Sequence, residues 1–458
     1  GLNMVIPIDQ YSALSNARSN ILIDEATVLR LSDKTGLHPS MTGLMDLYTQ
    51  GKLAVVQGVG YPNQNFSHFR STDIWLTGSN YNETLTSGWL GRYLDKEYPA
   101  YPDGYPNATN PDPLAIQIGS ILSTSIQGPT VGMGMAITSP TSFYQFLTGA
   151  VDPAPDTPAG HELTFIREVA QQTQMYAVSI KTAAAKVTTQ SAYPPGNSLA
   201  SQLKIVAQLI GGGLKTRLYV TNLGGFDTHD NQINRQQTLL SQLSAAIKAF
   251  QDDLKFLGAE DRVVGMTFSE FGRRIKSNAN GGTDHGAAAP LFVFGKRVTP
   301  GIVGANPILP ASATVNDNIP MQQDFRAVYS TILKNWFNVP DDELMSVMLN
   351  TFPTLPLINT TTGVAPNTVI PLSFTMSQNY PNPFNPTTHF QFSVASLQFV
   401  SIKVFDSVGR EVATLVNETM MPGVYTTGWN GVDEPSGVYY CRINAGSYQA
   451  TRKMVLQK

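Results

Sequence analysis

The sequence predicts an α/β domain built on a doubly wound, mostly parallel sheet, followed by a small C-terminal β-sandwich. Two observations carry this prediction. Over residues 1–350, apolar runs without polar alternation alternate with runs of helical period, as expected of buried parallel strands joined by helices. Over residues 373–458, short alternating strands separated by turns replace the helices. Residues 351–372 are rich in Thr, Pro and Asn, which predicts a linker between the two domains.

The composition is that of a weakly charged globular protein. Charged residues make up 14% of the 458 residues, and the net charge of −3 gives no electrostatic reason to expect binding to nucleic acid or to an anionic membrane. The single cysteine, Cys441, excludes an internal disulfide framework and a multi-thiolate metal site. No apolar run approaches the roughly 20 residues that span a bilayer. Because Gly1–Pro7 resembles the end of a strand, we expect further residues upstream of Gly1.

In the first half of the chain, the apolar period predicts a helix from Met41 to Gln50, ended by Gly51. The apolar run Leu53–Gly60 follows and predicts a buried parallel strand. The segment Ser79–Pro158 is rich in Tyr, Pro, Asn and Gly. We interpret it as an insertion that shapes a cleft, with a short strand at Leu114–Ile118.

In the second half, helical and strand patterns alternate before the sandwich begins. Helices are expected at Glu162–Ala185, Ser198–Ile210, Gln236–Leu257 and Gln322–Phe337, and strands at Arg217–Asn222, Val263–Phe268 and Leu291–Phe294. Sandwich strands are expected at Thr388–Val394, Val400–Asp406 and Gly437–Ile443.

Three short polar stretches lie next to apolar runs, at Gly224–His229, Thr267–Arg273 and Gly282–Gly286. In an α/β sheet, ligands gather at the carboxyl ends of the strands, so we expect these stretches to meet. Imidazole and carboxylate ligands suit zinc, manganese or iron. The candidate metal ligands are Asp227, His229, Glu270, Asp284 and His285.

A second interpretation is open for Asp227 and His229, which stand shortly before a helix and would satisfy its free N–H groups as caps. The metal interpretation is favoured because further acidic and histidine residues are expected at the same edge, where unpaired buried carboxylates are costly.

A strand, a polar loop and a helix follow one another around Ser67, His68 and Arg70. A helix N-terminus offers free N–H groups and a positive dipole end to an anion. Ser67 is therefore a candidate nucleophile, with His68 and Arg70 on the anion. Equally, Ser67 satisfies the requirements of a helix N-cap, and His68 those of a hydrogen-bonded packing histidine.

Structural roles are expected for the other residues of these types. We expect Trp75 and Trp89 in the core in preference to a substrate-binding surface, and surface ion pairs for Arg273 and Arg274 in preference to substrate binding. Structural positions are expected for His38, His161 and His389.

The C-terminal residues 373–458 resemble the C-terminal sorting domain of the type IX secretion system. The resemblance implies export across an outer membrane by the type IX secretion machinery, usually with cleavage of the domain, so that the cargo is released or attached to the cell surface. It is carried by Asn379–Thr388, Asp406–Val412, Ser436–Tyr440 and Lys453–Leu456.

The N-terminal residues resemble the DUF1501 family, a branch of the alkaline phosphatase/sulfatase superfamily. The resemblance implies an alkaline phosphatase-like fold, metal ions at strand ends and a nucleophile that opens a helix. By that analogy Asp227, His229 and His285 hold one metal ion and Glu270 a second. The stretches that carry it are Val59–Pro62, Ser67–Phe69, Asp73–Trp75, Gly88–Leu94, Gly225–His229, Ser269–Arg273 and Gly282–Gly286.

The chain departs from the better-known members of that superfamily in three places. They have Asp-x-x-x-His where this chain has Asp227-x-His229, and Asp-His where it has Glu270-Phe271. The metal-binding Asp that ends their first strand would fall before Gly1.

Two functions are compatible with the sequence. The first is a secreted or surface-attached hydrolase of phosphate or sulfate esters that uses one or two divalent ions, zinc, manganese or similar. The second is a non-catalytic surface protein that keeps the hydrolase fold and binds glycan or protein. A hydroxyl group beside the metal ligands would distinguish them.

Overall fold

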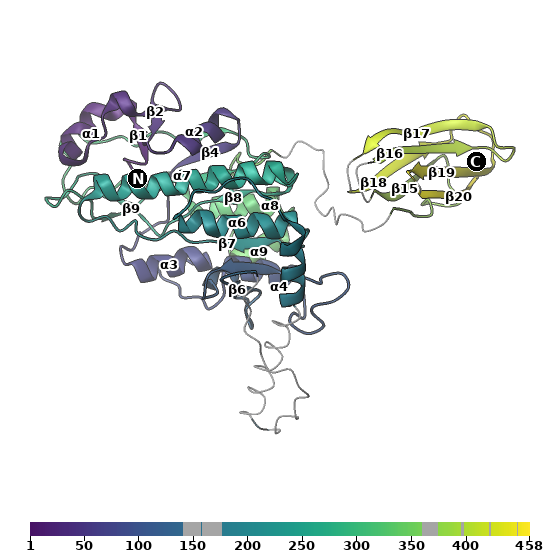
Figure 1. The fold of residues 1–458 in the computed structure, drawn as a ribbon, viewed down its shortest axis with the longest axis horizontal. Coiled ribbons are helices and arrows are strands. Elements are labelled where there is room, and N and C mark those ends of the chain that lie inside the picture. The colour runs from purple at the N-terminus through teal and green to yellow at the C-terminus, as the bar shows by residue number, and fades with distance from the viewer. Residues whose placement is uncertain (141–156, 158–175, 360–373, 395–397, 421–422, 447) are drawn as a thin grey trace. The chain divides into compact units, whose positions relative to one another are not determined.

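The computed structural model in Figure 1 describes residues 1–140, 157, 176–359, 374–394, 398–420, 423–446 and 448–458. The chain forms two compact units, Gly1–Thr361 and Thr362–Lys458. The predicted helix Glu162–Ala185 lies mostly outside the described residues, and its described part, residues 176–185, is helical. No helix in the described parts of the chain is long and apolar enough to cross a membrane.

The central sheet of the first unit is organised around β4 (Leu53–Gly60), every residue of which is buried. On one side β4 pairs in parallel with β12 (Gly301–Val303) and β13 (Gln323–Asp324). On the other side it pairs antiparallel with β11 (Ala289–Phe294), and β11 pairs antiparallel with β8 (Gly265–Met266).

The sheet therefore corrects one part of the prediction. The mixed α/β class is confirmed, but a large, mostly parallel doubly wound sheet is wrong for the described residues, because β11 runs against both its neighbours. The reason lies in the connection between β8 and β11. Parallel neighbours need a crossover, usually a helix, whereas residues 267–288 form loops and a small hairpin that reverse the chain.

A second, three-stranded sheet is parallel throughout. Strand β5 (Ala115–Ile118) lies between β6 (Met135–Ile137) and β7 (Leu218–Val220) and pairs in parallel with both. The predicted strands at Leu114–Ile118 and Arg217–Asn222 are thus confirmed, the first one residue shorter and the second three residues shorter than expected.

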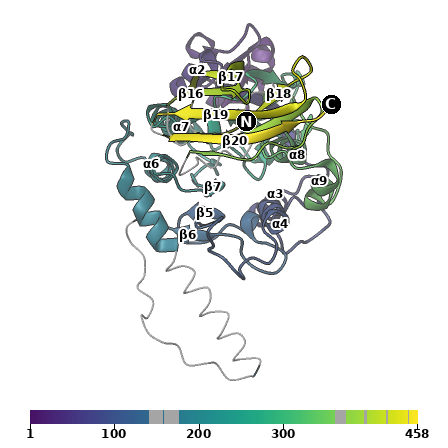
Figure 2. The same ribbon diagram turned by 90° about the vertical axis from the view of Figure 1, so that its right-hand side faces the viewer.

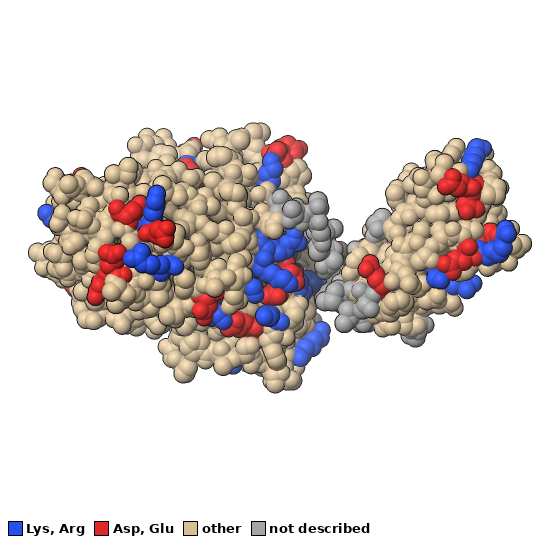
Figure 3. All heavy atoms as spheres, turned by 90° about the horizontal axis from the view of Figure 1, so that it is seen from above, with Lys and Arg blue, Asp and Glu red and all other residues tan. Residues whose placement is uncertain are grey.

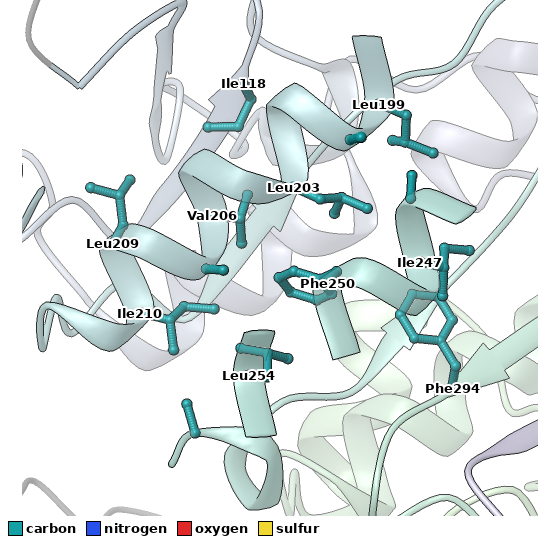
Figure 4. Close-up of a cluster of buried hydrophobic side chains, with 14 of the residues drawn as sticks. Ile118, Leu199, Leu203, Val206, Leu209, Ile210, Ile247, Phe250, Leu254 and Phe294 are labelled. Atoms are coloured by element: carbon teal, nitrogen blue, oxygen red, sulfur yellow. The ribbon is translucent and has the colours of Figure 1, made fainter. Parts of the chain in front are cut away.

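Helices cover both faces of these sheets. Alternate side chains of β4 enter two different cores, with Val55 in one and Val56 in the other. The first core is shared with α6 and α7, whose Leu203 and Phe250 meet in Figure 4. Figure 2 shows α6 and α7 on one side of β5–β7 and α3 and α4 on the other. The helices are α2 (Thr42–Thr49), α3 (His68–Thr77), α4 (Trp89–Glu97), α6 (Ser198–Gly211), α7 (Gln232–Phe256), α8 (Phe325–Asn335) and α9 (Asp341–Met348).

Both predicted core tryptophans, Trp75 and Trp89, are buried in the second core, where their rings stack on Phe325 and Tyr329. Helix α7 begins four residues before the predicted Gln236. The buried positions at its start are the amides Gln232 and Gln236, while the apolar Ile233 is exposed, so the hydrophobic period does not reveal this part of the helix.

The remaining elements of the first unit are short. A three-stranded antiparallel sheet joins β1 (Val5–Pro7), β3 (Thr35–Leu37) and β2 (Leu29–Arg30), next to α1 (Tyr11–Arg18). Strands β9 (Gly272–Arg273) and β10 (His285–Gly286) form a hairpin. Single turns of 3-10 helix occur at Ile8–Gln10, Ser19–Ile21, Glu25–Thr27, Thr124–Ile126 and Glu260–Arg262.

The second unit consists of two antiparallel sheets around a core of its own, which confirms the predicted sandwich region. Phe390 and Phe392 of one sheet, and Val400, Ile402 and Val404 of the other, alternate with exposed or half-buried residues and are buried in that core. The strand orders are β14 (Thr375–Met376), β15 (Thr387–Val394), β18 (Gly423–Asn430), and β17 (Glu411–Met420), β16 (Gln398–Phe405), β19 (Gly437–Ala445), β20 (Tyr448–Leu456).

The first part of the predicted linker packs on the first unit. Leu357 and Ile358 are buried in its second core. The carbonyl of Leu357 accepts a hydrogen bond from the Thr299 amide at 2.9 Å, and Ile358 bridges to Val298. Residues 360–372 of the predicted linker lie outside the described residues.

Charged side chains are sparse on the surface. On the face drawn in Figure 3, acidic and basic groups lie intermingled and are separated by wide uncharged areas. This distribution agrees with the small net charge of −3.

Candidate metal centre

Four segments that are distant in sequence meet at one edge of the first unit. They are the start of α3, which follows β4; the loop between β7 and α7; the loop after β8; and strand β10. Glycines allow this close approach. A Cβ at Gly282 would lie 2.2 Å from the His229 carbonyl group, and Gly225 adopts a φ of +98°, which favours glycine.

Asp227 stands at the centre of the cluster. Its Oδ1 lies 3.0 Å from Nε2 of His229 and 3.1 Å from Nε2 of His285. Its other oxygen, Oδ2, lies 3.3 Å from Nε2 of His68. The two imidazole Nε2 atoms of His229 and His285 are themselves only 2.9 Å apart. The Asp227 side chain is 48% exposed, so the cluster opens to solvent.

Each of the three imidazoles is held through its other ring nitrogen. Nδ1 of His68 lies 2.7 Å from Glu270 Oε1, and Nδ1 of His229 lies 3.1 Å from Asp284 Oδ1. Nδ1 of His285 lies 2.7 Å from the carbonyl oxygen of Phe66. Carbonyl and ionised carboxylate oxygens only accept hydrogen bonds, so Nδ1 carries the proton in each ring. In the neutral rings, Nε2 therefore presents a lone pair.

The cluster thus brings acceptor lone pairs close together, with no proton between the two imidazole Nε2 atoms of His229 and His285. Nε2 of His229, Nε2 of His285 and Oδ1 of Asp227 are mutually 2.9–3.1 Å apart. Nε2 of His68 is buried and makes no hydrogen bond within the described residues. Two things relieve such an arrangement: extra protons on the imidazoles, or a cation between the atoms.

The ligand types suit a metal ion, and the three atoms lie slightly closer together than the ligands of a bound ion. Ligand atoms of a tetrahedral zinc site, with bonds of about 2.0–2.2 Å, lie about 3.3–3.6 Å apart. Ligating histidines usually donate their second ring N–H to a carboxylate or carbonyl, which fixes the tautomer and raises the basicity of the ligand. His68, Asp227 and His285 offer one ligand atom each, all within 4.8 Å of one another, and could hold a metal ion.

Arg273 supports Asp227 from the protein side. Its nearly buried guanidinium donates to Asp227 Oδ1 at 2.7 Å and to the carbonyls of Phe226 and Thr283 at 3.0 and 2.6 Å. Partial burial raises the pKa of Asp227, but the hydrogen bond and the charge of Arg273, together with the close His285 ring, outweigh it, so this pKa lies well below its usual range. Asp227 is therefore ionised at neutral pH.

Asp284 is likewise kept ionised. The Asn278 amide donates to its Oδ1 at 3.1 Å. This hydrogen bond, together with the one from His229, lowers the pKa of Asp284 despite the opposing effect of partial burial. Asn278 also donates to the His229 carbonyl at 2.9 Å, so it fixes both partners of the pair.

The structure thus brings together most of the residues proposed from the sequence. Asp227, His229 and His285 face one another, while Glu270 and Asp284 contact the Nδ1 atoms of His68 and His229. The hydroxyl of Ser269 holds the other Glu270 oxygen at 2.9 Å.

Ser67 and Arg70 make none of the side-chain hydrogen bonds of this group that the described residues show. Ser67 is the N-cap residue of α3, and its exposed side chain makes no capping hydrogen bond in the described part of the chain. Its neighbours Phe66 and His68 both contact the cluster, so the Ser67 backbone lies beside it. The Arg70 guanidinium is turned to loop carbonyls, including those of Tyr81 at 3.0 Å and Glu83.

Sequence reasoning missed two partners. It expected a surface ion pair for Arg273, which instead is nearly buried against Asp227. It gave no role to Asn278, because a single amide in a loop carries no periodic pattern. The position of Arg273 within the stretch Thr267–Arg273 was the one available signal.

The remaining observations concern His38, His161 and a hollow in the surface of the first unit. His38 is buried, accepts a hydrogen bond from the Ser40 amide at 3.1 Å, and has its pKa lowered to about 4 by burial, in keeping with a structural role. His161 lies outside the described residues. A hollow of about 450 Å³ is lined by Asn335, Thr354 and their neighbours and by none of the cluster residues.

Two family models match the chain. The model described as a protein of unknown function, DUF1501, matches residues 154–347, which include Asp227, His229, Glu270, Asp284 and His285 but not His68. The secretion system C-terminal sorting domain matches residues 378–457. No curated protein sequence matches the chain.

Two solved structures from Porphyromonas gingivalis are similar over a short part of their length. One is PorZ, a surface component of the type-IX secretion system, at 19% identity, with 22% of this chain and 14% of that chain covered. The other is dimeric latent PorU, at 20% identity, with 22% and 10% covered. The TM-score is 0.16 in both cases.

Proposed function

Since the chain carries a DUF1501 domain and a C-terminal sorting domain of the type IX secretion system, as the sequence resemblance implied, we propose that it is an exported metal-dependent hydrolase of phosphate or sulfate esters. The sorting domain indicates export through the type IX system to the cell surface or the exterior. The hydrolase assignment adds to this the resemblance to the alkaline phosphatase/sulfatase superfamily and the chemistry of the cluster.

The single observation that carries the proposal is the convergence of three imidazole Nε2 atoms on one ionised carboxylate. In this proposal Asp227, His229 and His285 bind a divalent ion such as zinc or manganese, with His68 on the other Asp227 oxygen. Glu270 and Asp284, expected as ligands from the sequence, orient His68 and His229 instead. When bound, the ion supplies Lewis acidity to the oxygen of the ester.

The residues of the chain then position and accept the transferred group. Ser67 stands at the start of α3, where free N–H groups of the first turn favour an anion. Its Oγ forms a bond to phosphorus or sulfur while the ester bond breaks, and the proton that the serine hydroxyl loses ends on the departing alcohol. Water then cleaves the seryl ester, which releases phosphate or sulfate and restores the hydroxyl.

One observation favours a second function, a non-catalytic surface protein that keeps the metal site and binds glycan or protein. Both arginines nearest the cluster in sequence are engaged by the protein itself. Arg70 binds loop carbonyls and Arg273 binds Asp227. An anionic ester therefore finds its positive charge in the ion and in backbone N–H groups, not in these side chains.

The experiment combines metal analysis with an ester panel on the full chain. The protein is stripped with a chelator, reloaded with zinc or manganese, and assayed with aryl phosphates and aryl sulfates. Asp227→Asn should lose both the bound ion and the activity. Asp230→Asn is the matched control, because Asp230 lies three residues away and pairs only with Arg235 among the described residues. Bound metal with no hydrolysis of any ester would favour the binding protein, and no bound metal would refute both functions.

A further inference from the structure

A glutamine buried beneath the cluster connects the two loops that carry its central residues. Gln232 is the first residue of α7 and is almost fully buried. Its Oε1 accepts hydrogen bonds from the hydroxyl of Thr283 at 2.6 Å and from the hydroxyl of Thr228 at 3.4 Å. Its amide nitrogen donates to Gln236 at 3.3 Å, so both ends of the side chain are engaged.

The two threonines are next in sequence to the residues of the cluster. Thr228 lies between Asp227 and His229, and Thr283 directly precedes Asp284 and His285. Both threonines are buried. One oxygen atom of Gln232 is therefore hydrogen-bonded to both ligand-carrying segments.

Backbone hydrogen bonds bring the same segments together. The Thr283 amide donates to the Thr228 carbonyl at 3.2 Å, and the Gln232 amide donates to the Gly281 carbonyl at 2.9 Å. These bonds set which loops are neighbours. The hydrogen bonds from the Thr228 and Thr283 hydroxyls to Gln232 fix the position of one loop relative to the other, because both donate to the same oxygen atom.

We propose that Gln232 is a positioning residue of the metal centre: by accepting from Thr228 and Thr283 together, it sets the spacing of the His229 and His285 Nε2 atoms and thereby the affinity for the ion. This inference rests on the proposed metal site. A metal site requires its ligands within about 0.5 Å of the binding geometry, and outer-shell partners of ligands typically change metal affinity by about 10–100-fold when removed.

The alternative is that Gln232 only satisfies buried hydroxyl groups and contributes to stability. The two roles differ in one measurable quantity, the zinc dissociation constant of the folded protein. A structural role changes the unfolding midpoint and leaves that constant unchanged, whereas a positioning role changes the constant at temperatures where the variant is fully folded.

The chain offers a matched control on the same helix. Gln251 of α7 is also almost fully buried, and neither amide atom has a hydrogen-bond partner in the described part of the chain. Gln251→Met and Gln232→Met make the same chemical change at the same degree of burial. Only Gln232→Met removes an acceptor from the loops.

The test is zinc titration of the chelator-stripped full chain by calorimetry, with each variant's unfolding curve recorded alongside. We expect Gln232→Met to weaken zinc binding about tenfold or more, and Gln251→Met to leave it within about twofold of the wild type. Thr283→Val should weaken it similarly because it removes the donor, while Thr283→Ser, which keeps the hydroxyl, should restore it.

The outcomes separate the inference from the proposed function. If the wild type binds zinc and both Gln232→Met and Thr283→Val bind it within about twofold of the wild type, the positioning role is refuted and the metal site stands. If the wild type binds no zinc, both are refuted. Should Gln232→Met fail to fold, the Thr283→Val and Thr283→Ser pair decides.

Discussion

Leu357 offers a direct test of where the first unit ends. Its side chain is fully buried among residues of α8 and α9, although it lies in the Thr- and Pro-rich stretch that predicts a linker. Replacing it with alanine removes buried apolar atoms from a packed core, and such Leu→Ala changes cost about 2–5 kcal/mol. We expect about 3 kcal/mol for Leu357→Ala, a sizeable part of the roughly 5–15 kcal/mol by which domains are stable.

Shortening the chain enlarges this effect. A chain that ends at Thr361 keeps Leu357, Ile358 and the hydrogen bonds of this segment to Arg297 and Thr299, and should unfold at the same urea concentration as the first unit of the full protein. A chain that ends at Pro356 loses two buried side chains, and we expect a loss of about 4–10 kcal/mol from the same series of substitutions.

The assay is urea unfolding followed by tryptophan fluorescence, since Trp75, Trp89 and Trp336 report on the first unit. Met345→Ala on α9 is the control, because Met345 is exposed and its truncation should cost less than about 0.5 kcal/mol. Equal unfolding midpoints for the chains that end at Pro356 and at Thr361 would refute the packing of this segment.

Three further predictions concern charge, the hydroxyl and the shell around the ligands. Partial burial raises the pKa of Glu260, but hydrogen bonds and charges from Lys52 and Lys296 lower it overall. Glu260→Gln should therefore lower the free energy of unfolding by about 1 kcal/mol at pH 7. This difference from the wild type in urea unfolding should shrink as the pH falls below about 4.3 and vanish below the lowered pKa. A constant difference down to pH 2 would contradict this linkage. Ser67→Ala should abolish ester hydrolysis with zinc affinity kept and with less than about 0.5 kcal/mol lost, because Ser67 makes no capping bond; full activity in this variant would exclude Ser67 as the nucleophile. Asp284→Ala should weaken zinc binding about tenfold through the His229 ring, with Asp230→Ala unchanged, and equal affinities in calorimetry would argue against that role.

The sequence pattern predicts those parts of the fold that depend on local periodicity. The buried run Leu53–Gly60 and the alternating run beginning at Thr388 appear as strands close to the expected bounds, since burial on both faces or on one face leaves a direct trace in the order of apolar residues. Strand direction leaves no such trace. The reversal of β11 follows from a loop connection that looks, in sequence, like any other polar segment.

The candidate centre was predictable to a similar extent. Asp227, His229 and His285 were recognised because each is an ionisable residue in a short polar stretch next to an apolar run. The sequence did not predict which of these residues face Asp227 and which only contact the Nδ1 atoms of the histidines. His68 contacts Glu270, about two hundred residues away in sequence, and Asp227, about one hundred and sixty residues away. Which ring nitrogen of His68 faces which partner depends on tertiary geometry alone.

The central claim is that the Nε2 atoms of the histidines and the Asp227 carboxylate hold one shared cation. The most direct measurement is the X-ray absorption spectrum of the zinc-loaded full chain after dialysis. The account predicts stoichiometric zinc with a shell of nitrogen and oxygen ligands at about 2.0–2.2 Å and the outer-shell scattering of at least two imidazole rings. Loss of zinc on dialysis, or a shell without imidazole scattering, would contradict it.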